Sequence, residues 1–185
     1  MKLCTAIVLT YNEEIHIERC ISKLKFCKYM SIVVVDSYST DKTLSICKDF
    51  DVPVYQNTWV NYSSQFTYAL ENLDIQTPWI LRIDADEYLD EFFLNDLEGI
   101  LLKVSDEIHG LSLILKRKFL GNEIKFGIYR IRQLRLFRNG SAYIQSKEMD
   151  EHIVLKSGNV KKLGYYICDD NLNDIDYFIT KHLAY

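Results

Sequence analysis

Three clusters of acidic and polar residues each follow an apolar run of the sequence: Thr10-Tyr11-Asn12-Glu13-Glu14, residues 36–41 and Asp84-Ala85-Asp86-Glu87. Carboxylates can accept hydrogen bonds from a base or a ribose, and they can bind a divalent cation that carries a diphosphate. Backbone N–H groups at the starts of helices also attract phosphate. If the apolar runs are parallel strands of an open sheet, ligands bind outside their carboxyl ends. The three clusters therefore predict one nucleotide site at one edge of a sheet.

The pattern Asp-x-Asp occurs three times, and only the middle copy has the setting of a metal site. Asp84-Ala85-Asp86 directly follows the apolar run 79–83 and is extended by Glu87. The copies at 49–51 and 174–176 are typical of solvated loops or helix ends. Carboxylates this close repel one another unless a cation or an arginine lies among them. The alternative for the middle copy is an acidic loop that caps a helix.

The arginines are concentrated in one stretch. Five of the seven lie between residues 116 and 138, where Glu123 is the only acid. If 130–138 is a regular strand, Arg135 lies on its apolar face and requires an anion, either in a buried ion pair or in a phosphate. The stretch, which includes Arg132, could contact a nucleotide diphosphate, a lipid-linked diphosphate or an anionic membrane surface. A solvated basic face is the remaining alternative.

Hydrophobic periodicity predicts the elements that position these residues. In the first half, apolar runs alternate with amphipathic helical stretches, as in βαβ units with a parallel sheet. The expected strands lie at 3–9, 31–35, 52–55 and 79–83. Expected helices begin near Glu13-Glu14, after Thr40-Asp41, at about Tyr62 and after Asp90.

The second half, from about residue 107, is richer in expected strands. They lie at 110–119, 130–138, 149–155 and 160–167, and a helix is expected from Asn173. Gly121-Asn122 predicts a turn, and Asn139-Gly140 predicts a hairpin that joins two paired strands.

Composition excludes several classes of protein. An apolar fraction of 48% with 26% charged residues is typical of a folded domain, and a net charge of −4 argues against a general nucleic-acid binder. No apolar run approaches the roughly 20 residues of a membrane span. The five cysteines have no paired spacing, which favours buried, reduced thiols. Because residues 1–10 resemble a strand and not a signal peptide, a cytoplasmic location is expected.

Several stretches resemble one family. LTYNEE, VVVDSYSTDKT and WILRIDADEYLD are similar to the inverting nucleotide-sugar glycosyltransferases of family 2. KRKFLGNEI, RQLRLFRNG and MDEHIVLKSGNVKKL resemble a bacterial subgroup that builds lipopolysaccharide and capsule sugars. The resemblance implies an α/β protein with the GT-A fold, a Rossmann-like, mostly parallel sheet flanked by helices. It implies a single domain over 1–185, with a nucleotide-sugar-binding half at 1–106 and a β-rich, acceptor-side half at 107–185.

The resemblance also implies roles for individual residues. Thr10, Tyr11 and Asn12 would line the base pocket, and Asp36 would accept a hydrogen bond from the base. Asp84 would hold the ribose or the metal, and Asp86 would ligate the Mn²⁺ or Mg²⁺ that bridges the diphosphate. Further nucleotide-binding residues are expected at Glu14, Gln65, Arg82 and Ala85.

The catalytic base is expected in the second half. Inverting transfer is an in-line displacement at the anomeric carbon, so the acceptor hydroxyl must lose its proton as it attacks. The subgroup usually has a His-Glu pair here with Glu as the base. In Asp150-Glu151-His152, Glu151 matches that base and Asp150 replaces the His. Neighbours on a strand face opposite sides, so alternation alone does not choose between the two acids, and a solvent-facing pair is the alternative.

Two departures from the family pattern accompany this assignment. The family's later His, sometimes a metal partner, falls near Cys168-Asp169-Asp170, which leaves the third metal ligand open. Family members also commonly continue beyond the point where this sequence stops, so a short or truncated form is expected. His152, Arg132 and Arg135 are the candidates for contacts with the acceptor or a phosphate.

The expected function is metal-dependent sugar transfer from a nucleotide sugar, with a UDP-sugar as the expected donor, to a saccharide or lipid-linked saccharide. The protein is expected in the cytoplasm, and a peripheral contact with the inner membrane is the alternative. One rival is a sugar nucleotidyltransferase, which usually has a Gly-rich phosphate loop that residues 10–14 lack. The other is a non-catalytic nucleotide-sugar-binding protein.

Overall fold

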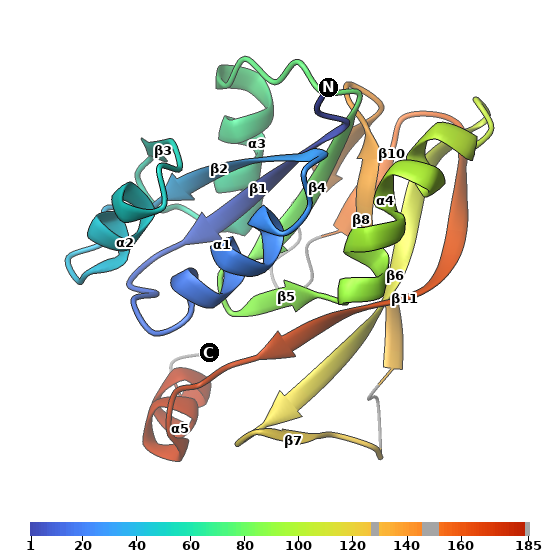
Figure 1. The fold of residues 1–185 in the computed structure, drawn as a ribbon. Helices are drawn as coiled ribbons and strands as arrows, with labels where there is room; N and C mark the ends of the chain where they lie inside the picture. The colour runs from blue at the N-terminus through green and yellow to red at the C-terminus, as the bar shows by residue number, and fades with distance from the viewer. Residues whose placement is uncertain (127–129, 146–151, 184–185) are drawn as a thin grey trace.

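The computed structural model of the chain describes residues 1–126, 130–145 and 152–183. Strands and helices alternate in the first half, in the order β1 (Cys4–Thr10), α1 (Ile17–Lys25), β2 (Met30–Asp36), α2 (Thr43–Asp49), β3 (Val54–Gln56), α3 (Tyr62–Asn72) and β4 (Trp79–Asp84). The four strands are parallel, in the spatial order β3-β2-β1-β4 (Figure 1). The predicted parallel sheet is therefore present, and its strands end within one or two residues of the expected positions.

The register of the central strands brings the three polar clusters together. Every residue of β1 is buried, as expected for a strand covered on both faces. Thr10 at its end pairs with Asp36 of β2, and Leu9 pairs with Asp84 of β4. The clusters that follow these strands therefore meet at one edge of the sheet.

The second half extends the same sheet. Its elements are β5 (Glu87–Leu89), α4 (Glu91–Lys103), β6 (Ile108–Phe119), β7 (Asn122–Glu123), β8 (Arg130–Arg138), β9 (Ala142–Gln145), β10 (His152–Leu155), β11 (Asn159–Asp170) and α5 (Ile175–Leu183). β8 lies antiparallel between β4 and β6, and β11 lies between β6 and β5. One nine-stranded sheet therefore runs through both halves (Figure 1).

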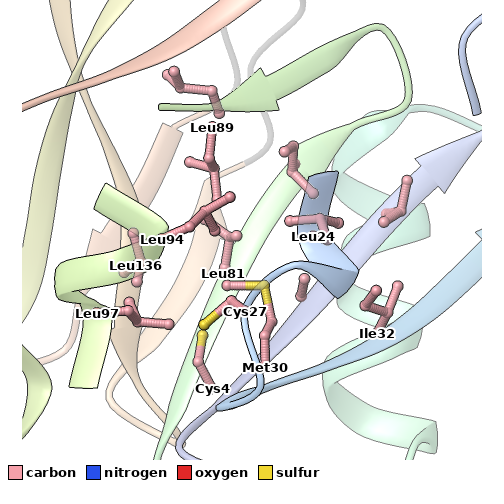
Figure 2. Close-up of a cluster of buried hydrophobic side chains, with 14 of the residues drawn as sticks. Cys4, Leu24, Cys27, Met30, Ile32, Leu81, Leu89, Leu94, Leu97 and Leu136 are labelled. Atoms are coloured by element: carbon pink, nitrogen blue, oxygen red, sulfur yellow. The ribbon is translucent and has the colours of Figure 1, made fainter. Parts of the chain in front are cut away.

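Helices cover both faces of the sheet. On one face, apolar residues of α1, α2 and α4 pack on β1, β2, β4 and β6, and Figure 2 shows Leu24, Leu94 and Leu97 of this cluster beside Leu81. On the other face, Phe66 of α3 packs in a second cluster with residues of β1, β4, β8 and β9. All five cysteines are buried and free, as predicted.

The hairpin prediction at Asn139-Gly140 is wrong. β8 pairs with β4 and β6, whereas β9 pairs with β10 in a separate two-stranded sheet. The Asn139 side chain donates to the Ile75 and Thr77 carbonyls at 2.7 and 3.3 Å, and its backbone N–H donates to the Pro78 carbonyl. These bonds fasten the turn to the loop before β4. The chain then leaves the main sheet, because Ala142 and Ile144 are buried in the cluster around α3.

The other local predictions agree with the structure. The turn expected at Gly121-Asn122 is present and joins β6 to β7 in a hairpin, with positive φ at Leu120 and Gly121. Asp90 caps α4 by accepting from the Phe92 N–H, and Asp41 accepts from the Thr43 N–H at the start of α2. Of the strand expected at 149–155, residues 149–151 lie outside the described residues. No helix in the described part of the chain is long and apolar enough to cross a membrane.

Candidate functional site

A cavity of about 760 Å³ lies where β1 and β4 end. Its lining includes members of all three polar clusters: Thr10, Tyr11, Glu13, Ser37, Tyr38, Asp84, Ala85, Asp86 and Glu87. Other lining residues come from α3 and the loop before it, from the end of β11 and from α5: Thr58, Trp59, Tyr62, Gln65, Asp169 and Tyr177. The edge predicted to bind a nucleotide is thus a cavity lined by both carboxylates and aromatic rings.

The loops after β1 and β2 are tied to each other beside this cavity. The Asn12 side chain accepts from the Thr40 N–H at 2.8 Å, and the Asn12 N–H donates to the Ser39 hydroxyl at 2.8 Å. Glu14 accepts from the Lys42 N–H at 3.0 Å. Neither Asn12 nor Glu14 is among the residues that line the cavity. Their observed contacts shape the loops that carry Tyr11 and Tyr38.

Asp36 is completely buried at the end of β2. Its carboxylate accepts from the Ser39 N–H at 2.9 Å, from the Ser39 hydroxyl and from the Gln56 amide at 3.3 Å. An ionised carboxylate can accept about four hydrogen bonds, so one further acceptor position remains. Asp36 is predicted to accept a hydrogen bond from the base. That bond would have to use the one remaining acceptor position of its carboxylate.

Gln65 and Arg82 support residues of the cavity. The buried Gln65 amide donates to the carbonyls of Asn57 and Thr58, at 3.1 and 2.8 Å, and so holds the loop before α3. Arg82 Nη2 lies 3.7 Å from Asp84 Oδ1, and its guanidinium lies 6.0 Å from the centre of the Phe66 ring. Their predicted contacts with a nucleotide remain predictions.

A buried ion pair lies under the acidic cluster. Arg135 Nη2 is 2.5 Å from Glu87 Oε1, and both side chains are almost fully buried. Arg135 Nη1 also lies 3.9 Å from Asp84 Oδ2, and Glu87 Oε2 accepts from the Asp84 N–H at 3.0 Å. Burial raises the pKa of Glu87, and the Arg135 guanidinium opposes that rise. Of the two alternatives for an arginine on an apolar face, the structure shows the ion pair, which holds Asp84 in place.

Asp169 also lies in the acidic cluster, although it was not among the main site residues predicted from the sequence. It is the residue before the last of β11, pairs in register with Glu87 and lines the cavity. Burial and the nearby Asp86 and Asp84 carboxylates raise the pKa of Asp169 to about 6, and Arg117 at 3.6 Å opposes them. Asp169 could have been predicted to lie at the site, because Asp169-Asp170 follow the expected strand at 160–167 as the other polar clusters follow their strands.

The acidic cluster fits a divalent cation whose shell is completed by a ligand. Asp84 Oδ1 is buried and accepts no hydrogen bond from the described residues, and the charged group beside it is Arg82 Nη2 at 3.7 Å. Within those same residues, no group of three or more His, Cys, Asp or Glu side chains forms a metal cage. Mg²⁺ and similar ions are often held by one or two carboxylates together with phosphate oxygens and water. Asp84 and Asp86 are the residues that would hold such an ion.

The other predicted residues lie apart from the cavity lining. Arg132 is exposed and donates to the Leu163 carbonyl at 2.6 Å. His152 is exposed on β10, in the two-stranded sheet. Asp150 and Glu151 lie outside the described residues, so their assignment as catalytic acids stays a prediction from sequence.

Comparison with known proteins identifies the family. Residues 5–118 match the family described as Glycosyl transferase family 2, which is more than half of the chain. The chain belongs to glycosyltransferase family 2. The predicted membership in a family of transferases is thereby confirmed.

Two curated relatives illustrate the extent of the likeness. The chain is 34% identical over 163 residues to the lipopolysaccharide core biosynthesis glycosyltransferase LpsC of Rhizobium meliloti, covering 84% of this chain and 58% of LpsC. It is 37% identical over 99 residues to an uncharacterized glycosyltransferase of Rickettsia bellii, covering 54% of this chain and 33% of that protein. The matched part of this chain therefore spans between a third and three fifths of the length of these relatives.

Solved structures support the fold. Residues 1–349 of TarS from S. aureus superpose with a TM-score of 0.63 at 19% identity, over 90% of this chain and 60% of that one. At this identity the likeness concerns the fold alone. The predicted GT-A architecture is confirmed.

Proposed function

We propose that this family 2 domain transfers a sugar from a nucleotide sugar, with a UDP-sugar as donor, to a saccharide or lipid-linked saccharide acceptor. The observation that carries the proposal is the cavity at the ends of β1 and β4, which is lined by Asp84, Asp86 and Asp169 together with aromatic side chains. Its volume of about 760 Å³ is within the usual range of small-molecule sites. The relative LpsC is named for lipopolysaccharide core biosynthesis, and TarS has been crystallised with UDP-GlcNAc. The name of LpsC supports a surface saccharide as the product, and the TarS complex supports a uridine nucleotide as part of the donor.

Different residues of the cavity would bind the base and the diphosphate of the donor. Tyr11 and Thr10 would hold the base, and Asp86 with Asp84 would bind Mn²⁺ or Mg²⁺ at the diphosphate. When bound, the cation neutralises the charge that develops on the departing nucleoside diphosphate. Arg135 and Glu87 keep Asp84 in position from below.

The remaining steps belong to the acceptor side of the cavity. A carboxylate must take the proton of the acceptor hydroxyl, and Glu151 is the proposed group. Donor sugars made in the cytoplasm and acceptors at the inner membrane surface would meet at this cavity. A peripheral contact with that membrane is part of the proposal.

Asp86→Ala should abolish the part of UDP binding that depends on Mn²⁺. A ligand at 100 times its Kd stabilises a folded protein by about 2.7 kcal/mol, so the effect is measurable as a thermal shift. UDP is added with Mn²⁺ or with EDTA, and the difference between the two shifts is compared between the variant and the unaltered chain. A difference that survives in Asp86→Ala would refute the metal role of this residue. A chain that responds to no nucleoside diphosphate would refute the function itself.

Asp36→Ala should weaken UDP binding equally with and without Mn²⁺. The expected loss is about 1–3 kcal/mol, the cost of removing one charge-assisted bond from a buried group. Because Asp36 also holds Ser39 and Gln56, Ser39→Ala serves as the control for a disturbed loop. Calorimetric titration of UDP measures the loss. Equal affinities of Asp36→Ala and the unaltered chain would contradict a contact with the base.

A further inference from the structure

The end of β11 is fastened to the turn between β4 and β5 directly at Asp86. The Asp170 N–H donates to the Asp86 carbonyl at 3.1 Å. Arg19 Nη2 donates to both the Asp86 and the Asp170 carbonyls, at 3.1 and 2.6 Å. One guanidinium from α1 therefore joins two backbone segments that are far apart in the sequence. Figure 1 shows β5 and β11 running side by side at this end of the sheet.

The side chain of Asp170 anchors this junction. Its carboxylate is buried and receives Arg19 Nη1 at 3.0 Å and Lys118 Nζ at 3.2 Å. The Tyr88 ring lies beside both cations, 5.0 Å from the Arg19 guanidinium and 5.4 Å from Lys118 Nζ. Removing either partner of such a buried pair is costly, so the junction is held in one arrangement.

Asn171 extends from this junction to the Asp86 carboxylate. Its Nδ2 donates to Asp86 Oδ2 at 3.1 Å, and its Oδ1 accepts from the Asn173 N–H at 3.0 Å. The Asn173 N–H requires an acceptor and the Asp86 carboxylate requires a donor, so the amide has one consistent orientation. The next residue is also fixed, since the Leu172 N–H donates to the buried His16 Nε2 at 2.8 Å.

We propose that Asn171 is a positioning residue for Asp86. By engaging Oδ2, its amide leaves the other Asp86 oxygen to face the cavity, in the orientation that binds the cation of the donor diphosphate. A carboxylate that is ordered before binding loses less conformational entropy when the cation arrives. Groups that hydrogen-bond to metal ligands typically change metal affinity 10–100-fold when they are removed. The inference rests on the proposed function, in which Asp86 binds a divalent cation.

Asn171→Ala in the 185-residue chain tests this role without measuring turnover. Titration of Mn²⁺ into protein saturated with UDP, followed by the electron paramagnetic resonance signal of free Mn²⁺, should show affinity reduced by roughly 10–100-fold. UDP binding in EDTA should stay within about twofold of the unaltered chain, because Asn171 contacts Asp86 and is not among the residues that line the cavity.

Asn173→Ala is the matched control, two residues along the same segment, and should retain the Mn²⁺ affinity. If Asn171→Ala does not fold, Asn171→Ser replaces it, because its hydroxyl is too short to reach Asp86 and should give the same loss. Unchanged Mn²⁺ affinity would overturn the positioning role, and so would an equal loss of UDP binding with and without metal. Failure of the unaltered chain to bind UDP and Mn²⁺ would instead overturn the proposed function, and this inference with it.

Discussion

Glu151→Gln should lower the rate of sugar transfer by roughly 10²–10⁴-fold, the usual contribution of a general base. Glutamine keeps the shape and most hydrogen bonding of glutamate, but it cannot take a proton from the acceptor hydroxyl. Affinity for UDP should barely change, because the base acts on the acceptor and not on the diphosphate. The rate of UDP release with a saccharide acceptor and the Kd of UDP measure the two effects separately.

Asp150→Asn is the internal control for this prediction. If the segment is a regular strand, Asp150 and Glu151 face opposite sides, so the Asp150 variant should cost much less. A severe effect of Asp150→Asn with a mild effect of Glu151→Gln would mean that the alignment with the family is off by one residue.

Asp169→Asn tests the rival base that the structure presents. Asp169 lines the cavity, and its pKa of about 6 is close to the pH at which a base is effective. If Asp169 and not Glu151 is the base, Asp169→Asn becomes the severe variant. The rate of the unaltered chain should then fall as the pH drops through the pKa of Asp169, which a cation bound at Asp84 and Asp86 would lower below about 6, since the protonated acid cannot accept the proton.

Arg135→Ala should lower the free energy of unfolding by about 3–5 kcal/mol at pH 8, the usual cost of leaving one partner of a buried ion pair. The loss follows from Glu87, which would remain almost fully buried without its cation 2.5 Å away. Burial already raises the pKa of Glu87 in the folded state above the value in the unfolded chain, and loss of Arg135 would raise it further. The variant should therefore lose stability as the pH rises above 4.5, the ordinary pKa of a glutamate, and recover part of it as the pH falls towards that value, where the unfolded carboxyl also takes up a proton. Urea unfolding at pH 5 and pH 8 measures the difference.

Two controls distinguish this from a general loss of contacts. Arg132→Ala removes an exposed arginine from the same strand and should cost only about 0.5–1.5 kcal/mol, the value of one hydrogen bond. Arg135→Met combined with Glu87→Leu removes both charges and should restore most of the stability. If the double variant is as unstable as Arg135→Ala, packing and not the unpaired carboxylate explains the loss.

The order of apolar and polar residues was enough to predict the first half of the fold and the edge of the sheet where the cavity lies. Apolar runs such as 3–9 and 31–35 have hydrophobic residues at nearly every position, which suits only strands covered on both faces. Parallel strands joined by helices must end at the same edge, so the polar residues after them had to meet. Thr10 beside Asp36, and Leu9 beside Asp84, follow from this geometry. Local patterns were sufficient because each strand and the helix after it form one continuous segment.

The distant segments that complete the site could not be predicted, because long-range packing selects them. Asn139-Gly140 is typical of a hairpin turn, yet β8 does not pair with β9. Instead, β8 lies in the main sheet between β4 and β6 and pairs with both. Arg135 could have met a phosphate, and the fold supplied Glu87 instead. Asn171 reaches Asp86 across 85 positions of the chain, through the pairing of β11 with β5. Such contacts depend on the packing energy of many strands together, and no residue pattern within one segment contains that information.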